Sequence, residues 1–104
     1  MPIVLAITSC PDAETARRLS RALIEERLAA CVTQLPGARS VFRWEGGVQE
    51  AEEVVCFIKT TSERVADLRH RLPLLHPYEL PELVVLDVTD GLPAYLDWIV
   101  TETS

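Results

Sequence analysis

The sequence contains few of the residues on which common enzyme mechanisms and structural metal sites depend. Its 104 residues include three cysteines and two histidines, and no Cys-x-x-Cys pair occurs. These counts support neither a disulfide framework nor a structural zinc site. Two histidines give no basis for a Ser-His-Asp triad, and the sequence has no glycine-rich phosphate loop. We therefore predict a protein that is not an enzyme and that uses no organic cofactor.

Positive charge and long apolar runs are scarce as well. Sixteen acidic residues outnumber ten lysines and arginines, which gives a net charge of −6. Nucleic acids need a basic patch to meet their phosphates, so we expect no nucleic-acid partner. No apolar run approaches the roughly 20 residues that cross a bilayer, and the start Met1-Pro2-Ile3-Val4 lacks the features of a signal peptide. The sequence predicts a cytoplasmic protein with no membrane partner and one domain, residues 1–104.

The apolar periodicity predicts the order strand, helix, strand, strand, helix, strand, with a short helix at the C-terminal end. The expected strands are 3–8, 31–34 resumed at 40–44, 48–60 and 83–88, and the expected helices are about 11–27, about 61–73 and a segment after Leu92. We expect Pro36-Gly37 to interrupt the second strand, 45–47 to form a hairpin turn and Pro73 to end the second main helix. This order predicts an α+β, ferredoxin-like split βαβ fold, with an antiparallel sheet and two main helices on one face.

Two features of the strands indicate that the chain forms an oligomer. In the runs 3–7, 54–58 and 83–86, apolar residues stand at both odd and even positions, so they point to both faces of the sheet. Helices on one face would cover only half of them. Another copy of the chain is the simplest cover for the other face. An extended strand over 48–60 spans about 40 Å, while a domain of this size has a radius of gyration of roughly 13 Å. The hairpin should therefore overhang its domain and present open edges to a neighbour.

The richest cluster of chemical groups is the segment 76–82, His-Pro-Tyr-Glu-Leu-Pro-Glu, which two prolines should stiffen. Copper favours thiolate and imidazole ligands, with carboxylate as a weaker one. The candidates are His76, Cys10, Glu79 and Glu82. Cys10 precedes Pro11 at an expected strand-to-helix corner, where a helix N-terminus would lower the pKa of a thiol. Nothing lies at chelate spacing on one helix, so a neighbouring protomer completes the site or the metal is held loosely.

A small-molecule pocket in a cleft between subunits is the competing hypothesis. An aromatic wall, a cation, carboxylates and a thiol would give it the mixed lining of a ligand site. The candidate residues are Cys31, Trp44, Glu53, Lys59, Tyr78 and Glu82. Structural roles stay open for several of them. Trp44 is suited to burial at an interface, Lys59 to an ion pair with Glu53 or Glu82, and Tyr78 to anchoring its segment through the hydroxyl.

Linked motifs along nearly the whole chain resemble the CutA family of divalent-cation tolerance proteins. They are Glu26-Arg27-Leu28-Ala29-Ala30-Cys31, Pro36-Gly37 followed by Ser40, Trp44-Glu45-Gly46, Ile58-Lys59-Thr60, His76-Pro77-Tyr78-Glu79 with Pro81-Glu82, and Gly91-Leu92 with Tyr95-Leu96 and Trp98. The resemblance implies a ferredoxin-like homotrimer with long hairpins around the threefold axis. It also implies a protein that binds copper or another divalent cation, responds to metal ions and has no established catalytic chemistry.

The same resemblance leaves an alternative. The family is similar in architecture to the PII signalling proteins, which bind small ligands in clefts between subunits, so the alternative is a trimeric ligand-binding or assembly module without a specific metal site. The chain also departs from some family members at two positions. Leu75 stands where those members carry a histidine, and Thr8 stands where they carry a cysteine, with Cys10 two residues later.

Overall fold

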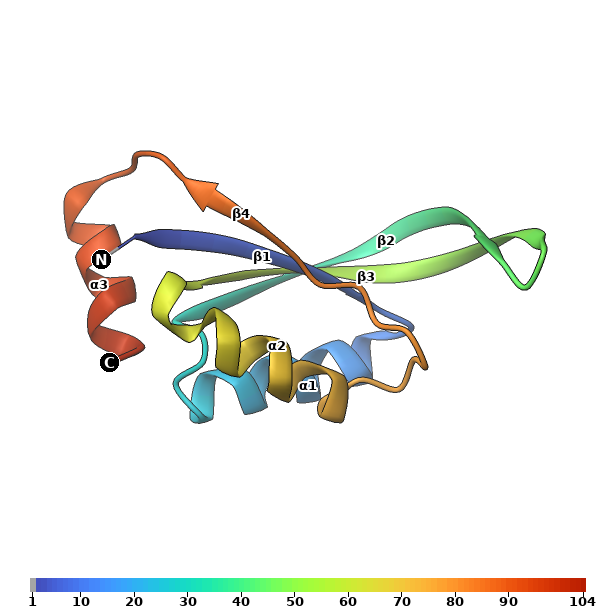
Figure 1. Ribbon diagram of the computed structural model, residues 1–104, viewed down its shortest axis with the longest axis horizontal. Helices are drawn as coiled ribbons and strands as arrows, with labels where there is room; N and C mark the ends of the chain where they lie inside the picture. Colours follow the sequence, from blue (N-terminus) through green and yellow to red (C-terminus); the bar gives the residue numbers. More distant parts are fainter. Residues whose placement is uncertain (1) are drawn as a thin grey trace.

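Two shorter strands and two long ones form one antiparallel sheet with two helices beneath it (Figure 1). The computed structural model describes residues 2–104. Its elements are β1 (Ile3–Cys10), α1 (Ala13–Glu25), β2 (Cys31–Trp44), β3 (Gly47–Thr61), a 3-10 turn (Ser62–Arg64), α2 (Val65–Leu75), β4 (Val84–Val88) and α3 (Pro93–Glu102). The strand order is β2-β3-β1-β4, and every neighbouring pair is antiparallel. This confirms the predicted α+β, ferredoxin-like architecture.

Helix α1 shows how local sequence positions the main core. Asp12 is extended and caps the helix, since its side chain accepts a 2.7 Å hydrogen bond from the Thr15 amide. The helix therefore begins after Asp12 rather than at Pro11. Ala16, Leu19 and Leu23 follow at helical spacing, and all three are buried against the sheet. Burial of each leucine stabilises the fold by about 1.5–3 kcal/mol.

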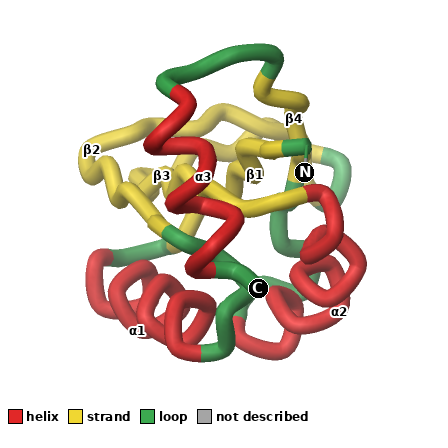
Figure 2. The backbone as a smooth tube through the Cα atoms, turned by 90° about the vertical axis from the view of Figure 1, so that its left-hand side faces the viewer, coloured by secondary structure: helices red, strands yellow, loops and turns green. Residues whose placement is uncertain are grey.

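The core lies between the sheet and the two main helices. Figure 2 shows α1 and α2 side by side beneath the sheet and α3 across one end of it. The β1–β3 register places Ala6 opposite Ile58 and Thr8 opposite Cys56 on the helix-facing side. A smaller cluster joins Ile99 of α3 to Ile3. Among residues 2–104 no helix is long and apolar enough to cross a membrane.

The other face of the sheet is apolar and only partly covered. Leu5 and Phe57 are half-buried there, while Val84 and Leu86 of β4 are each 47% exposed. The β1–β4 register aligns Leu5 with Leu86, which places them on the same face. Apolar side chains therefore lie on both faces of the sheet, as predicted. In the described part of this chain, those on the outer face remain partly accessible to solvent.

The hairpin of β2 and β3 extends well beyond the helices (Figure 1). The longest dimension of the molecule is 44 Å, against a radius of gyration of 14.1 Å. Glu45 and Gly46 form the turn, with φ angles of 52° and 79°. Two consecutive positive φ angles define the two-residue turn whose twist matches that of the strands. Both the hairpin turn and the overhang are confirmed.

Two predicted interruptions do not occur. Pro36-Gly37 does not break β2, because the chain accommodates these residues as a bulge between Leu35 and Ala38, with Gly37 at φ 83°. Pro73 does not end α2, which continues to Leu75. It lies in the last turn of the helix, where it removes a single i→i−4 hydrogen bond, and the fully buried Leu72 holds that turn against the core.

Candidate functional site

A cleft lies between the segment after α2 and the overhanging hairpin. Its volume is about 670 Å³, within the range of small-molecule sites. Aromatic rings, carboxylates and a few neutral polar groups share the lining. The lining residues are Ser9, Ser40, Phe42, Arg43, Trp44, Gln49, Ala51, Glu53, Pro77, Tyr78, Glu79, Leu80 and Glu82. The cleft thus includes four residues of the predicted ligand set: Trp44, Glu53, Tyr78 and Glu82.

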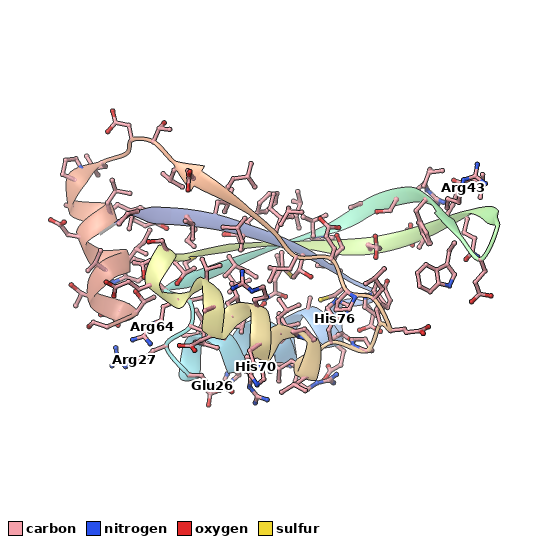
Figure 3. The ribbon with its side chains drawn as sticks, viewed as in Figure 1. Glu26, Arg27, Arg43, Arg64, His70 and His76 are labelled. Carbon is pink, nitrogen blue, oxygen red and sulfur yellow. The ribbon has the colours of Figure 1, made fainter. Side chains whose placement is uncertain are left out.

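His76 fixes the start of the segment that forms one wall. Its side chain is buried, with Nε2 2.7 Å from the Ser9 carbonyl oxygen and Nδ1 accepting a 3.2 Å hydrogen bond from the Tyr78 amide. A carbonyl can only accept, so these partners assign the proton to Nε2 and leave the imidazole neutral. Figure 3 shows His76 where the chain leaves α2. Both ring nitrogens are therefore engaged by the backbone.

The hydroxyl of Tyr78 reaches across the cleft to β3. It donates a 2.8 Å hydrogen bond to Oε2 of Glu53, a carboxylate that is only 9% exposed. Burial, followed by the hydrogen bond to Glu53 and the charge of Glu53, raises the pKa of Tyr78 well above its ordinary value. The pair is a neutral phenol held by a buried carboxylate. Tyr78 therefore anchors its segment, as proposed from its position between the prolines.

The far end of the same wall is tied to β1. Thr8 Oγ1 donates to the Glu82 carbonyl oxygen at 2.6 Å, and Ser9 Oγ donates to Glu82 Oε1 at 3.4 Å. Together with the His76–Ser9 contact, these bonds hold both ends of 76–82 against one strand. Hydrogen bonds within the chain therefore hold the segment 76–82, which forms this wall of the cleft, in place without a bound ligand.

Trp44 and Arg43 form the hairpin side of the cleft. The indole Nε1 of Trp44 donates a 3.0 Å hydrogen bond to Glu45, so its polar group is already satisfied and its ring remains available to the cleft. Arg43 is exposed, and among residues 2–104 it is the one basic residue in the lining. Figure 3 shows it well out along the hairpin, at a distance from His76. The inner part of the cleft is therefore acidic and aromatic.

Cys31 and Lys59 lie elsewhere in this chain. They face each other in the β2–β3 register, near the opposite end of β3 from the turn. Lys59 Nζ donates to Thr33 Oγ1 at 2.9 Å and contacts Cys31 Sγ at 3.7 Å. Neither residue lines the cleft, and Lys59 bonds to these neighbours rather than to Glu53 or Glu82.

Three of the four candidate metal ligands, Cys10, Glu79 and His76, occupy different environments. Cys10 belongs to β1 and is fully buried on the helix side, where a hydrogen bond with Cys56 and burial raise the pKa of its thiol. The pKa lowering expected at a helix start therefore does not occur. Glu79 is exposed at the cleft, and both nitrogens of His76 are occupied. Within residues 2–104 no three His, Cys, Asp or Glu side chains lie together as a metal-holding group.

Several cleft residues escaped the sequence reasoning, although the hairpin register indicates where to find them. Counting back from the turn pairs Trp44 with Gly47, Phe42 with Gln49 and Ser40 with Ala51. The same count continues to Glu53 on β3. Alternation along a strand places every second residue on one face, so the Glu45-Gly46 turn was the signal that identifies Phe42, Gln49 and Ser40 as neighbours of Trp44 and Glu53.

The fold and cleft define a single-sheet ferredoxin-like α+β protein with an extended hairpin. The chain belongs to the family described as CutA1 divalent ion tolerance protein, whose model matches residues 4–102. It is 48% identical over 97 residues to the divalent-cation tolerance protein CutA of Pectobacterium atrosepticum, covering 92% of this chain and 87% of that one. It is 41% identical over 100 residues to protein CutA of mouse, covering 94% of this chain but only 56% of the mouse protein.

A solved structure agrees with this assignment. The crystal structure of CutA from Xylella fastidiosa superposes with a TM-score of 0.95 at 48% identity, covering 98% of each chain. Names in this family describe tolerance to divalent ions and are not names of enzymes. The predicted family is therefore confirmed.

Proposed function

We propose that this protein is a homotrimeric divalent-cation-binding protein that takes part in the response to copper or another divalent metal ion. The observation that carries the proposal is membership of the divalent ion tolerance family over residues 4–102. The protein acts by binding rather than by catalysis and needs no organic cofactor. We place it in the cytoplasm, because its three cysteines are free and a reducing compartment keeps thiols in that state.

The sheet supports the oligomeric part of the proposal. Its outer face exposes Val84 and Leu86, and the hairpin carries exposed Val41 and Val48 beyond the helices. Apolar surface of this kind is stabilised when another protein surface covers it. Three copies arranged with outer faces inward and hairpins packed side by side would cover both regions.

The separation of candidate ligands supports a metal site shared between subunits. Glu79 is the accessible ligand in one chain. His76 could bind a metal ion through Nδ1 if its hydrogen bond from the Tyr78 amide broke. At 3.2 Å, this is the longer of the two hydrogen bonds that the imidazole makes. The thiol of Cys10 is fully buried, so a metal ion could reach it only if the end of β1 moved away from the core. A copper or similar ion would therefore bind first to Glu79 and to groups of an adjacent subunit, since carboxylate alone is a weak ligand for copper.

Equilibrium dialysis with elemental analysis tests the metal proposal. The reduced, tag-free protein is dialysed against copper or zinc, beside Glu79→Gln, His76→Ala and the control Glu63→Gln, which changes an exposed carboxylate outside the cleft. Stoichiometric binding that falls in Glu79→Gln but not in Glu63→Gln supports the proposal. Binding below one ion per trimer at micromolar metal, or equal binding by all four proteins, contradicts it.

A small-molecule function is the second candidate, and the cleft favours it. A volume of about 670 Å³ is far larger than a metal ion needs and matches an organic ligand. This second function keeps the trimer, because the cleft lies on the face that is turned toward the other subunits and would open between them.

A further inference from the structure

We propose that the cleft binds a small organic cation, namely a protonated amine attached to an aromatic or apolar body. The site lies between the segment 77–82 and the β2–β3 hairpin. The ammonium group meets the carboxylate of Glu53, and the body of the ligand lies against Tyr78 and Phe42. This proposal is independent of metal binding.

The charge of the lining selects a cation. Three carboxylates line the cleft, those of Glu53, Glu79 and Glu82, against the single guanidinium of Arg43. The anionic excess is greatest on the inner side, because Arg43 is exposed and lies far out along the hairpin (Figure 3). An anionic ligand would meet like charge there, whereas an ammonium gains attraction from several directions.

Glu53 gives this charge a specific point of attachment. The residue is only 9% exposed, and Tyr78 satisfies Oε2 alone. Within residues 2–104 no hydrogen bond reaches Oε1. Oε1 is not one of the buried atoms that lack a partner in the described residues, so it remains open to solvent and to a charged donor of a ligand. An ammonium has three N–H donors, so one group can bond to Oε1 and still reach a second acceptor in the lining.

The aromatic residues determine what the amine is attached to. Phe42, Trp44 and Tyr78 all line the cleft. The indole N–H of Trp44 is occupied by Glu45, and the Tyr78 hydroxyl by Glu53, so both residues offer their rings rather than their polar groups. Ring faces attract cations and pack against flat apolar groups. An alkylammonium group attached to an aromatic body fits this lining better than a fully hydrophilic polyamine.

The wall is already in place without a ligand. His76 and Ser9 hold its beginning, Thr8 and Ser9 hold its end at Glu82, and Tyr78 fixes its centre to β3. A preformed wall reduces the conformational entropy lost on binding. By contrast, the carboxylates are spread around a large cleft and form no compact metal-holding group in the part of the chain that the structure describes.

Three probes that differ in one functional group test the proposal. Tryptamine, indole-3-ethanol and indole-3-acetate carry an ammonium, a hydroxyl and a carboxylate on the same ring system. Each is titrated calorimetrically into the intact oligomer in buffer with EDTA. We expect saturable tryptamine binding, at least about tenfold weaker binding of the alcohol and no binding of the acid. Equal binding of the three probes, no binding of tryptamine, or tryptamine binding that needs added zinc overturns the proposal.

Matched variants locate the binding site. Glu53→Gln keeps the size of the side chain but removes its charge, and we expect it to weaken tryptamine binding by about tenfold or more. Glu79→Gln changes an exposed residue whose loss the fold tolerates, and it should weaken binding by a smaller factor. Glu63→Gln is the control and should bind as the parent does. Unchanged affinity in a folded Glu53→Gln protein, or in Glu79→Gln if Glu53→Gln does not fold, overturns the assignment.

Failure here is distinguishable from failure of the metal proposal. Metal binding is measured by elemental analysis in the absence of amine, and amine binding is measured with EDTA present. Loss of one signal therefore leaves the other readable.

Discussion

The hydroxyl of Tyr78 lies 2.8 Å from Oε2 of Glu53, although the two residues are 25 positions apart in the sequence. This one contact joins the stiff segment after α2 to the middle of β3 and closes one side of the cleft. It also explains how the chain tolerates a carboxylate that is only 9% exposed. The first prediction follows from breaking this hydrogen bond.

Replacing Tyr78 by phenylalanine should destabilise the protein. The ring is retained, but Glu53 loses its hydrogen-bond donor while staying largely buried, which costs about 1–3 kcal/mol of unfolding free energy. Urea unfolding at fixed protein concentration measures the loss, since assembly makes stability depend on concentration. Tyr95→Phe is the control, because no described residue accepts a hydrogen bond from that hydroxyl. Equal effects of the two variants would show that the contact contributes nothing.

Alkaline pH should weaken the same contact. Burial and Glu53 raise the pKa of Tyr78 in the folded state above that of the unfolded chain. The stabilisation is therefore fully present below the ordinary tyrosine pKa of about 10 and is lost as pH rises through the folded-state pKa. Unfolding free energy should fall with rising pH in this range, and fall less in Tyr78→Phe. Parallel pH profiles for the two proteins would contradict the assignment.

The two histidines should respond differently to substitution. His76→Ala leaves the Ser9 carbonyl and the Tyr78 amide without partners, and we expect a loss on the order of 2 kcal/mol or more in unfolding free energy. His70 is exposed on α2 and points away from the sheet (Figure 3). His70→Ala should change stability by less than about 0.5 kcal/mol. Denaturant titration of both variants measures the difference, and similar values would mean that His76 is not the anchor described above.

The turn offers a comparison between adjacent glycines. Gly46 has φ 79°, and a Cβ there would meet no atom within 4 Å, so any cost of Gly46→Val arises from backbone strain alone. That cost is about 1–2 kcal/mol. The φ of Gly47 lies outside the left-handed region, and its nearest atom is the Trp44 carbonyl oxygen at 4.0 Å, so Gly47→Val should cost clearly less. Thermal melting tests this prediction. A lower melting temperature for Gly47→Val than for Gly46→Val would contradict it.

The outer face of the sheet allows a test of assembly that spares the core. Leu86→Lys places a charge on the partly exposed face, whereas Leu74→Lys changes a 68% exposed residue on α2. We expect the first to raise the dissociation concentration of the trimer about tenfold or more and the second to leave it unchanged. Sedimentation velocity across a dilution series measures both. An unaffected Leu86→Lys trimer would mean that this face is not the interface.

Ile58, on the opposite face, is a poorer choice for that experiment. It is fully buried in the main core beneath the sheet, so a lysine there would unfold the domain and remove the oligomer indirectly. The sequence could show that both faces of β3 are apolar. It could not show which face meets the helices, because that depends on the register with β1 and on the packing of Leu19 and Leu23.

Local rules predicted most of the fold and part of the site. Periodicity and turn residues identified the order of elements, and two positive φ angles at Glu45 and Gly46 confirmed the hairpin. The same rules overstated the effect of Pro73, since tertiary burial of Leu72 outweighs one lost hydrogen bond. Cys10 illustrates a further limit. The strand continues two residues beyond the expected end, and this withdraws the thiol from the helix terminus.

Contacts between segments that are distant in the chain could not be predicted from the sequence. The proposed ion pair between Lys59 and Glu53 is replaced by bonds from Lys59 to Thr33 and Cys31, partners that only the β2–β3 pairing brings near. His76 was identified as important, but its two backbone partners depend on where β1 ends. Residue type indicated the candidates, and strand pairing decided their neighbours.

The bulge in β2 controls which side chains form the cleft wall. Between the pairs Leu35–Val55 and Ala38–Glu53, β2 advances three residues while β3 advances two. This extra residue reverses the alternation for the rest of β2, so Phe42 and Trp44 lie on the face that carries Glu53. If β2 kept all its residues and paired without the bulge, the alternation would place Val41 and Arg43 on this face instead of the two rings. Deleting Gly37 would remove the extra residue and leave Phe42 and Trp44 facing the cleft, whereas inserting one residue between Ala38 and Ser40 would replace this aromatic wall with an aliphatic and cationic one.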